Sequence, residues 1–203
     1  MDSDTIENYP WPHWIIDNFL DEEDFNIIRT EALDILKTID VTNSPSPIEK
    51  NHGIYIVRKS EDKQWPEIVK KYERRLIKFK DAGLPIRKHE QLVFKSNITF
   101  AGPGANYPCH YEVPTKIFAT TTYLYPDVSV GTKLYMRDKS YFAPVHAKTV
   151  DWAPNKTCCF IPQDDITWHS YDNPFRKTRI VLLMGFVDKG RQTNFYENSP
   201  DVL

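Results

Sequence analysis

The hydrophobic pattern of this 203-residue chain changes its period near residue 90, and that change limits the folds available to it. Before it, apolar side chains recur at helical spacing over residues 21–38 and again from about residue 65 to Gly83. After it come short runs rich in Val, Ile, Thr, Tyr and Phe, separated by Gly, Pro, Asn and Asp. Two helices followed by several short strands predict an α+β chain dominated by a β-sandwich or barrel.

The expected elements form one unit. We predict strands at residues 53–58, 91–101, 116–125, 132–136, 145–152, 157–161 and 178–187. A Pro/Ser-rich loop is expected at residues 43–47. Because no linker, internal repeat or low-complexity stretch interrupts the chain, we predict a single domain over residues 1–203. It has a mainly helical part (1–90), a core of strands (91–188) and a C-terminal tail (189–203).

Composition excludes several classes of partner. Lys and Arg total 26 against 28 Asp and Glu, a net charge of −2, which predicts neither a nucleic-acid groove nor binding to an anionic membrane. The longest apolar run, residues 180–187, is far shorter than the roughly 20 residues that span a bilayer. The acidic N-terminus lacks the features of a signal peptide, and the three cysteines are too few for a disulfide framework. We therefore predict a soluble, cytoplasmic protein with reduced thiols.

One histidine is placed to act together with a carboxylate. Of the six histidines, only His110 has an acidic residue two positions later, Glu112. The flanking Pro108 and Pro114 disfavour a helix there, so the segment is expected to be extended. In an extended segment residues i and i+2 point to the same face, so both side chains would project toward a shared point.

A third ligand would have to come from a distant part of the chain. His169 supplies it if the sheet closes as a barrel and returns this residue beside His110. Two histidines and one carboxylate on one face of a metal are typical of non-haem Fe(II) sites that keep positions open for other ligands. The alternative is a half-buried histidine packed beside Trp168, with no metal.

A charged residue opens the most apolar strand. Arg179 begins the run RIVLLMGFV, where a buried guanidinium is costly without an anionic partner. Its fork geometry suits a carboxylate, and we expect it to point into the barrel on the face shared with Val181. The alternative is an arginine exposed beyond the end of the strand.

Taken in order, these residues resemble a family. The matching positions are Tyr107, His110-Tyr-Glu112, Tyr123-Leu124, Gly131, Trp168-His169 and Arg179, with an opening segment at residues 9–20 that is also similar. The chain resembles the Fe(II)- and 2-oxoglutarate-dependent oxygenases, especially the compact prolyl-hydroxylase-like enzymes of bacteria and viruses. The resemblance covers most of the chain, and its core runs from about residue 91 to 188.

The resemblance implies a fold and a set of ligands. The fold would be a double-stranded β-helix, a cupin-like jelly roll with the N-terminal helices packed on its outside. Fe(II) would be held by His110, Glu112 and His169. The remaining metal positions would take 2-oxoglutarate and O2. The distal carboxylate of 2-oxoglutarate would meet Arg179 and Tyr123.

Further implied contacts complete the site. Tyr107 is a weaker candidate for contacting 2-oxoglutarate, whose carbon chain would lie along Leu134 and Val181. The implied enzyme is a dioxygenase that couples oxidative decarboxylation of 2-oxoglutarate, to succinate and CO2, to hydroxylation of a substrate.

Two residues depart from the pattern of the family. Glu112 stands where Asp is usual, and its extra methylene moves the carboxylate by about one C–C bond length. Val181 stands two residues after the arginine, where Ser or Thr is common. The change at Glu112 would affect the affinity for the metal. The change at Val181 removes a hydroxyl group from the expected site of the distal carboxylate.

Other functions remain open on sequence alone. One is a non-catalytic jelly-roll module that binds a protein or sugar and keeps a degenerate metal pocket. Another is a cupin-like metalloenzyme with different chemistry and His146 as an extra ligand. Within the oxygenase hypothesis a peptidyl proline is the first candidate substrate, and free amino acids, other small molecules and modified nucleosides remain alternatives. The sequence does not identify the oligomeric state.

Overall fold

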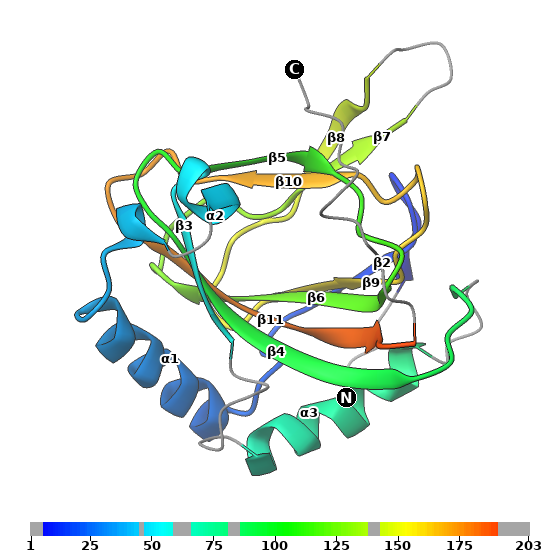
Figure 1. Ribbon diagram of the computed structural model, residues 1–203, viewed down its shortest axis with the longest axis horizontal. Coiled ribbons are helices and arrows are strands. Elements are labelled where there is room, and N and C mark those ends of the chain that lie inside the picture. Colours follow the sequence, from blue (N-terminus) through cyan, green and yellow to red (C-terminus); the bar gives the residue numbers. More distant parts are fainter. Residues whose placement is uncertain (1–5, 45–46, 59–65, 81–85, 138–142, 191–203) are drawn as a thin grey trace.

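Two antiparallel sheets face each other and form the body of the protein (Figure 1). The computed structural model describes residues 6–44, 47–58, 66–80, 86–137 and 143–190. The larger sheet has seven strands in the order β1-β2-β9-β6-β11-β4-β3, and the smaller has four in the order β5-β10-β7-β8. This layered arrangement agrees with the predicted β-dominated jelly roll.

The strands of the larger sheet come from both halves of the chain. They are β1 (Ile6–Glu7), β2 (His13–Ile16), β3 (Ile54–Arg58), β4 (Leu92–Ala101), β6 (Lys116–Tyr125), β9 (Thr157–Phe160) and β11 (Arg179–Asp188). Those of the smaller sheet are β5 (Asn106–His110), β7 (Lys133–Met136), β8 (Val145–Thr149) and β10 (His169–Asp172).

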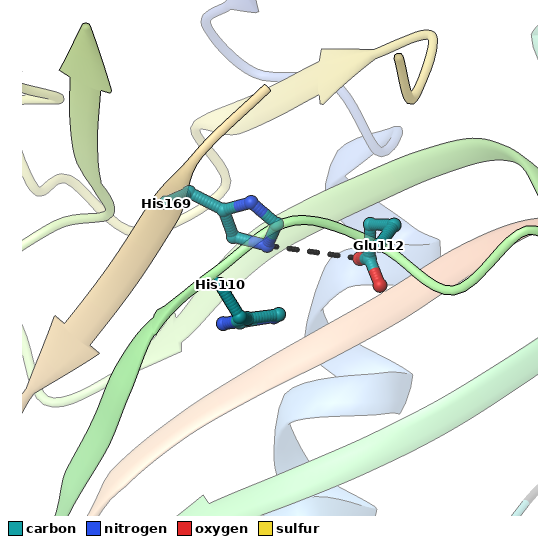
Figure 2. A group of neighbouring side chains, drawn as sticks. All are labelled: His110, Glu112 and His169. Atoms are coloured by element: carbon teal, nitrogen blue, oxygen red, sulfur yellow. Dashed lines mark ion pairs between the residues drawn. The ribbon is translucent and has the colours of Figure 1, made fainter. Parts of the chain in front are cut away.

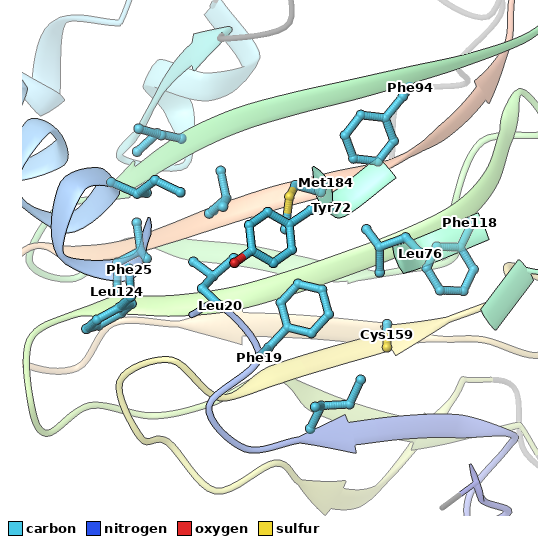
Figure 3. Close-up of a cluster of buried hydrophobic side chains, with 14 of the residues drawn as sticks. Phe19, Leu20, Phe25, Tyr72, Leu76, Phe94, Phe118, Leu124, Cys159 and Met184 are labelled. Carbon is cyan, nitrogen blue, oxygen red and sulfur yellow. The ribbon is translucent and has the colours of Figure 1, made fainter. Parts of the chain in front are cut away.

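Two helices cover the outer face of the larger sheet, as predicted (Figure 1). They are α1 (Glu22–Leu36) and α3 (Pro66–Lys80). In α1 the acidic residues of the first turn complement the helix dipole. Phe25 of α1 and Tyr72 and Leu76 of α3 pack into a core with Phe118, Met184 and other residues of the sheet (Figure 3). Burial of this apolar surface holds the helices on the sheet.

Strand β11, which lies between β6 and β4, separates this core from the interior between the sheets. Its even-numbered residues, such as Ile180 and Leu182, belong to the core under the helices. Its odd-numbered residues Arg179, Val181 and Leu183 line a cavity between the two sheets. The alternation of strand side chains thus gives β11 one structural face and one face that points into the interior.

Most predicted strands agree with the structure to within one or two residues, and the main differences lie in short elements. The predicted strand 145–152 ends at Thr149, and β1, β2, β5 and β10 were not predicted as strands. Each is two to five residues long, and β5 contains Pro108, which argues against a strand by sequence. Three strands of the larger sheet, β1, β2 and the predicted β3, lie within residues 1–90 beside the helices.

The predicted loop at residues 43–47 lies between two short elements in the connection from α1 to β3, and residues 45–46 are outside the described residues. These elements are a 3-10 turn at Val41–Asn43 and a short helix α2 at Pro47–Asn51. Gly83, expected at the end of the second helix, and most of the predicted tail lie outside the described residues. Within the described parts of the chain, neither 15-residue helix nor any other is long and apolar enough to cross a membrane.

Candidate metal centre

Strand pairing brings the two histidines together. β5 and β10 are antiparallel neighbours in the smaller sheet, and His110 and His169 are direct partners in their register. The ring centroids lie 4.3 Å apart. The backbone ladder therefore places two imidazoles from distant parts of the sequence side by side (Figure 2).

Glu112 completes the group from just beyond the end of β5. Its Oε1 lies 3.7 Å from Nε2 of His169, the pair joined by the dashed line in Figure 2. One ligand atom from each of His110, Glu112 and His169 lies within 4.8 Å of the other two. Ligand atoms that share one ion at about 2.1 Å lie roughly 3 to 4 Å apart, so a small closure of this group suffices to hold a metal.

Hydrogen bonds orient both imidazoles for metal binding. Nδ1 of His110 lies 2.9 Å from the carbonyl oxygen of Pro108, and Nδ1 of His169 lies 2.9 Å from that of Thr167. A carbonyl oxygen only accepts, so each Nδ1 carries the proton and donates it. Each Nε2 is then left with a lone pair, the arrangement that metal-ligating histidines commonly have.

Burial and local charge set the protonation states that a metal needs. Burial lowers the pKa of His169 to about 4 and also lowers the pKa of His110. Burial alone would raise the pKa of Glu112, but Lys116 and the two histidines outweigh it and lower that pKa to about 2. Neutral imidazoles beside an ionised carboxylate are the ligand forms that bind a divalent cation.

Lys116 is a partner of the carboxylate that the sequence did not suggest. Its Nζ donates a hydrogen bond of 2.7 Å to Oε1 of Glu112. This is the same oxygen that faces His169, so the ammonium group and a bound cation would compete for it.

Arg179 lies buried in the interior with part of its guanidinium unpaired. The residue is 1% exposed, and its Nε donates to the carbonyl oxygen of Val130 at 3.3 Å. Nη1 and Nη2 have no hydrogen-bond partner among the described residues. Aromatic rings surround the group, with Tyr171 at 4.5 Å and Trp152 at 5.1 Å from the guanidinium carbon. A buried charge with two open donor groups indicates a site for an anion.

One cavity connects this arginine with the three candidate metal ligands. It has a volume of about 340 Å³ and is lined by His110, Glu112, His169 and Arg179. Tyr107 and Val181 also line it, whereas Leu134 is not among the described residues of its wall. Leu134 instead packs in a second apolar cluster with residues such as Trp11 and Val150.

Tyr123 contacts the arginine with its ring rather than with its hydroxyl group. The Tyr123 hydroxyl donates to Oγ1 of Thr132 at 3.1 Å and accepts from the Thr132 backbone N–H at 2.9 Å. Its ring lies 5.7 Å from the guanidinium carbon and stacks on Trp152. Thr132, and not Tyr123, is among the described residues of the cavity wall.

Thr99 is a cavity residue that the sequence analysis missed. It lies on β4, directly opposite Val181 on β11, and is 2% exposed. Its hydroxyl has no partner among the described residues, and the residue lines the same cavity as Arg179. It offers on the neighbouring strand the hydroxyl group that Val181 lacks. The placement of Thr99 opposite Val181 follows from the register of β4 and β11, which cannot be read from a single sequence.

His146 does not belong to the group. It lies on β8, and its Nε2 is 2.9 Å from Oγ1 of Thr149. Two strands, β7 and β10, separate β8 from β5 in the smaller sheet. The structure therefore gives no support to a site with His146 as an extra ligand.

The fold is that of known prolyl hydroxylases. A prolyl-4-hydroxylase of Pseudomonas putida superposes with a TM-score of 0.60 at 15% identity, covering 88% of this chain and 93% of that one. A Trichoplax adhaerens prolyl hydroxylase, solved with a peptide of hypoxia inducible factor, gives 0.61 at 16% identity, covering 88% and 84%. A non-haem α-ketoglutarate-dependent epimerase of nogalamycin biosynthesis gives 0.57 at 13% identity, covering 94% and 85%. No family model and no curated protein sequence matches the chain.

The predicted double-stranded β-helix is thus confirmed. At these identities the likeness establishes the fold, while the reaction has to be argued from the site. Two of the three similar structures are prolyl hydroxylases and one is an epimerase, so the fold alone does not determine which reaction the substrate undergoes.

Proposed function

We propose that this protein is a non-haem Fe(II) dioxygenase that couples oxidative decarboxylation of 2-oxoglutarate to hydroxylation of a substrate. One observation carries the proposal: the unpaired guanidinium of Arg179 shares a cavity with a histidine–carboxylate–histidine group. A cation site and an anion site in one enclosed space suit a ligand that chelates a metal at one end and ends in a carboxylate at the other.

The residues present fit the metal that the fold implies. His110, Glu112 and His169 would hold Fe(II) on one face, with the opposite positions left for 2-oxoglutarate and O2. Iron, when bound, would activate O2, so that one oxygen atom enters succinate as 2-oxoglutarate loses CO2 and the other enters the hydroxylated substrate.

The protein's own task is to hold and enclose 2-oxoglutarate. Arg179 binds the distal carboxylate through Nη1 and Nη2, which accounts for their lack of a protein partner. The hydroxyl of Thr99 and the side chains of Tyr107 and Val181 form the adjacent wall. The rings of Trp152 and Tyr171 beside the guanidinium keep water away and strengthen the charge interaction.

For the substrate we propose a peptide, with a prolyl residue as the first candidate. Support comes from the two prolyl hydroxylases of the same fold, one of them solved with a peptide bound. No feature of the described residues favours a nucleic acid, since the net charge of the chain is −2.

Calorimetry with Mn(II) and 2-oxoglutarate under anaerobic conditions tests the site, and succinate formation with Fe(II), O2 and candidate peptides tests the reaction. His169→Ala should abolish metal binding and turnover. Arg179→Ala should leave metal binding intact and weaken 2-oxoglutarate binding by at least 100-fold, about 2.7 kcal/mol.

His146→Ala is the matched control, because this histidine lies outside the group, and it should bind both ligands like the parent protein. Parent-like binding of both ligands by His169→Ala and Arg179→Ala would contradict the proposal.

A second function is favoured by one contact, the hydrogen bond between Lys116 and Glu112. If the ammonium group permanently occupies the carboxylate, the protein is a non-catalytic binding module with a degenerate metal pocket. Absence of any Mn(II) binding by the parent protein, together with binding by Lys116→Met, would identify this case.

A further inference from the structure

The segment that carries Glu112 lies between two strands and meets the larger sheet near its end, where the backbone N–H of Asp188 donates to the carbonyl oxygen of Thr115 at 2.8 Å. β5 ends at His110 and β6 begins at Lys116, so the residues between them belong to no strand. The ladder with β10 fixes His110 opposite His169 but stops short of the carboxylate. Glu112 also has one more side-chain torsion than an Asp, so its carboxylate can take more positions and needs other contacts to hold it at the site.

One arginine, Arg87, binds the backbone of this segment at more than one carbonyl oxygen. Arg87 lies between α3 and β4, and its side chain is 8% exposed. Its Nη1 donates to the carbonyl oxygens of Val113 at 2.6 Å and Lys116 at 3.0 Å, and its Nη2 donates to that of Glu112 at 3.0 Å. These hydrogen bonds supply the partners that the missing ladder would otherwise give to the backbone.

The same guanidinium also reaches the loop that leads to His169. Nη2 of Arg87 forms an ion pair with the carboxylate of Asp164. Asp164 lies in the connection between β9 and β10, and that connection ends where β10 starts at His169. One planar group therefore joins the two segments that deliver Glu112 and His169 to the candidate metal site.

We propose that Arg87 is a positioning residue that sets the place of Glu112 relative to the two histidines and so sets the metal affinity of the protein. The proposal rests on the metal site of the proposed function. Lysine would not replace it, because an ammonium group cannot donate in one plane to several carbonyl oxygens and a carboxylate as the guanidinium fork does. Loss of groups that orient metal ligands typically weakens metal binding by about 10- to 100-fold.

The test compares the Mn(II) dissociation constants of two arginine variants, measured by calorimetry well below the unfolding temperature. Arg87→Met keeps most of the aliphatic volume and should raise the dissociation constant by about 10- to 100-fold. Arg75→Met is the matched control: Arg75 also donates to a backbone carbonyl, that of Phe19, and packs on the Phe19 ring. Arg75→Met should lower the thermal stability and leave the Mn(II) affinity unchanged. If the role of Arg87 were merely structural, Arg87→Met would behave in the same way as this control.

A second variant keeps the test decisive if Arg87→Met does not fold. Asp164 is 65% exposed at its side chain, so Asp164→Asn should fold normally while removing the ionic part of the contact with the His169 loop. We expect a severalfold higher dissociation constant for Mn(II). Parent-like Mn(II) affinity in Asp164→Asn would contradict a contribution of the Arg87–Asp164 ion pair to metal binding. Parent-like Mn(II) affinity in Arg87→Met would overturn the whole inference.

The two proposals fail in different ways. A parent protein that does not bind Mn(II) would overturn the proposed function and this inference together. A parent protein that binds Mn(II) through His169, with unchanged affinity in Arg87→Met, would overturn the inference alone.

Discussion

At the scale of single residues, the interior of this protein holds a charge that destabilises the ligand-free fold. Burial lowers the pKa of Arg179, which means that the charged guanidinium is disfavoured where it lies. Against this stand one hydrogen bond, to Val130, and contacts with aromatic rings. A ring contact contributes roughly 0.5 to 2 kcal/mol, whereas desolvation of an ion costs several kcal/mol. The ring contacts therefore offset only part of the cost, and an anionic ligand would supply the rest.

Arg179→Met should therefore leave the ligand-free protein as stable as the parent or more stable, by up to about 1 to 4 kcal/mol, as for other buried charges replaced by apolar groups. The same variant should no longer bind 2-oxoglutarate. Urea unfolding of both proteins without ligands measures the difference. A loss of several kcal/mol would mean that the rings already satisfy the guanidinium and that no ligand is needed.

Thr99 is a second residue whose role follows from an unpaired group. Thr99→Val has nearly the same shape, and we expect it to weaken 2-oxoglutarate binding by about tenfold, since the hydroxyl would donate to a charged carboxylate. An analogue without the distal carboxylate, such as 2-oxobutyrate, should bind both proteins equally. Calorimetry with the Mn(II)-loaded proteins makes the comparison. An equal loss for both ligands would indicate a general change in the cavity instead.

At the scale of elements, β11 organises the molecule. It pairs with β4 on one side and with β6 on the other along nearly its whole length. One of its residues, Gly185, lies so close to β6 that a Cβ added there would be 2.2 Å from the carbonyl oxygen of Phe118. The glycine thus permits a close backbone approach in the middle of the sheet.

Gly185→Ala should lower the free energy of unfolding by about 1 to 3 kcal/mol or more, because rigid backbone rather than a side chain would have to move. Gly190→Ala, just beyond the end of β11, is the control. The three atoms nearest to its added Cβ would be side-chain atoms of Glu90 and Asp188, at 3.1 to 3.3 Å, so a smaller loss is expected. Equal losses in urea unfolding would show that the close approach is not what requires the glycine.

At the scale of the whole molecule, the first 90 residues do more than cover the sheet. They supply β1 and β2 at one edge of the larger sheet and β3 at the other. They also supply α1 and α3, whose side chains fill the core against β11. The boundary at residue 90 therefore separates residues that form one sheet. We predict that the chain unfolds as a single unit.

A fragment of residues 91–190 should accordingly fail to fold, since it would expose both new sheet edges and the apolar face under the helices. Circular dichroism during thermal unfolding measures this, and the full chain should show one cooperative transition where the fragment shows none. A cooperative transition of the fragment near the midpoint of the full chain would contradict the prediction of one domain.

The sequence by itself determined the features that depend on neighbouring residues. The period of the apolar residues placed α1, α3 and the longer strands, because each such element shows its buried face within a few residues. Pro108 and Pro114 indicated an extended segment at His110, and the apolar run after Arg179 indicated a buried guanidinium. Both expectations agree with the structure, in which β5 ends at His110 and Arg179 is 1% exposed.

Only the tertiary structure decided which distant groups meet. The register of β5 and β10 places His110 beside His169, and that of β4 and β11 places Thr99 beside Val181. The hydrogen bonds of Arg87 to the Glu112 segment depend on the path of a connection between α3 and β4. Pairings of this kind are set by the burial of whole faces and by side-chain packing across the molecule. They are therefore properties of the folded chain and not of any local pattern.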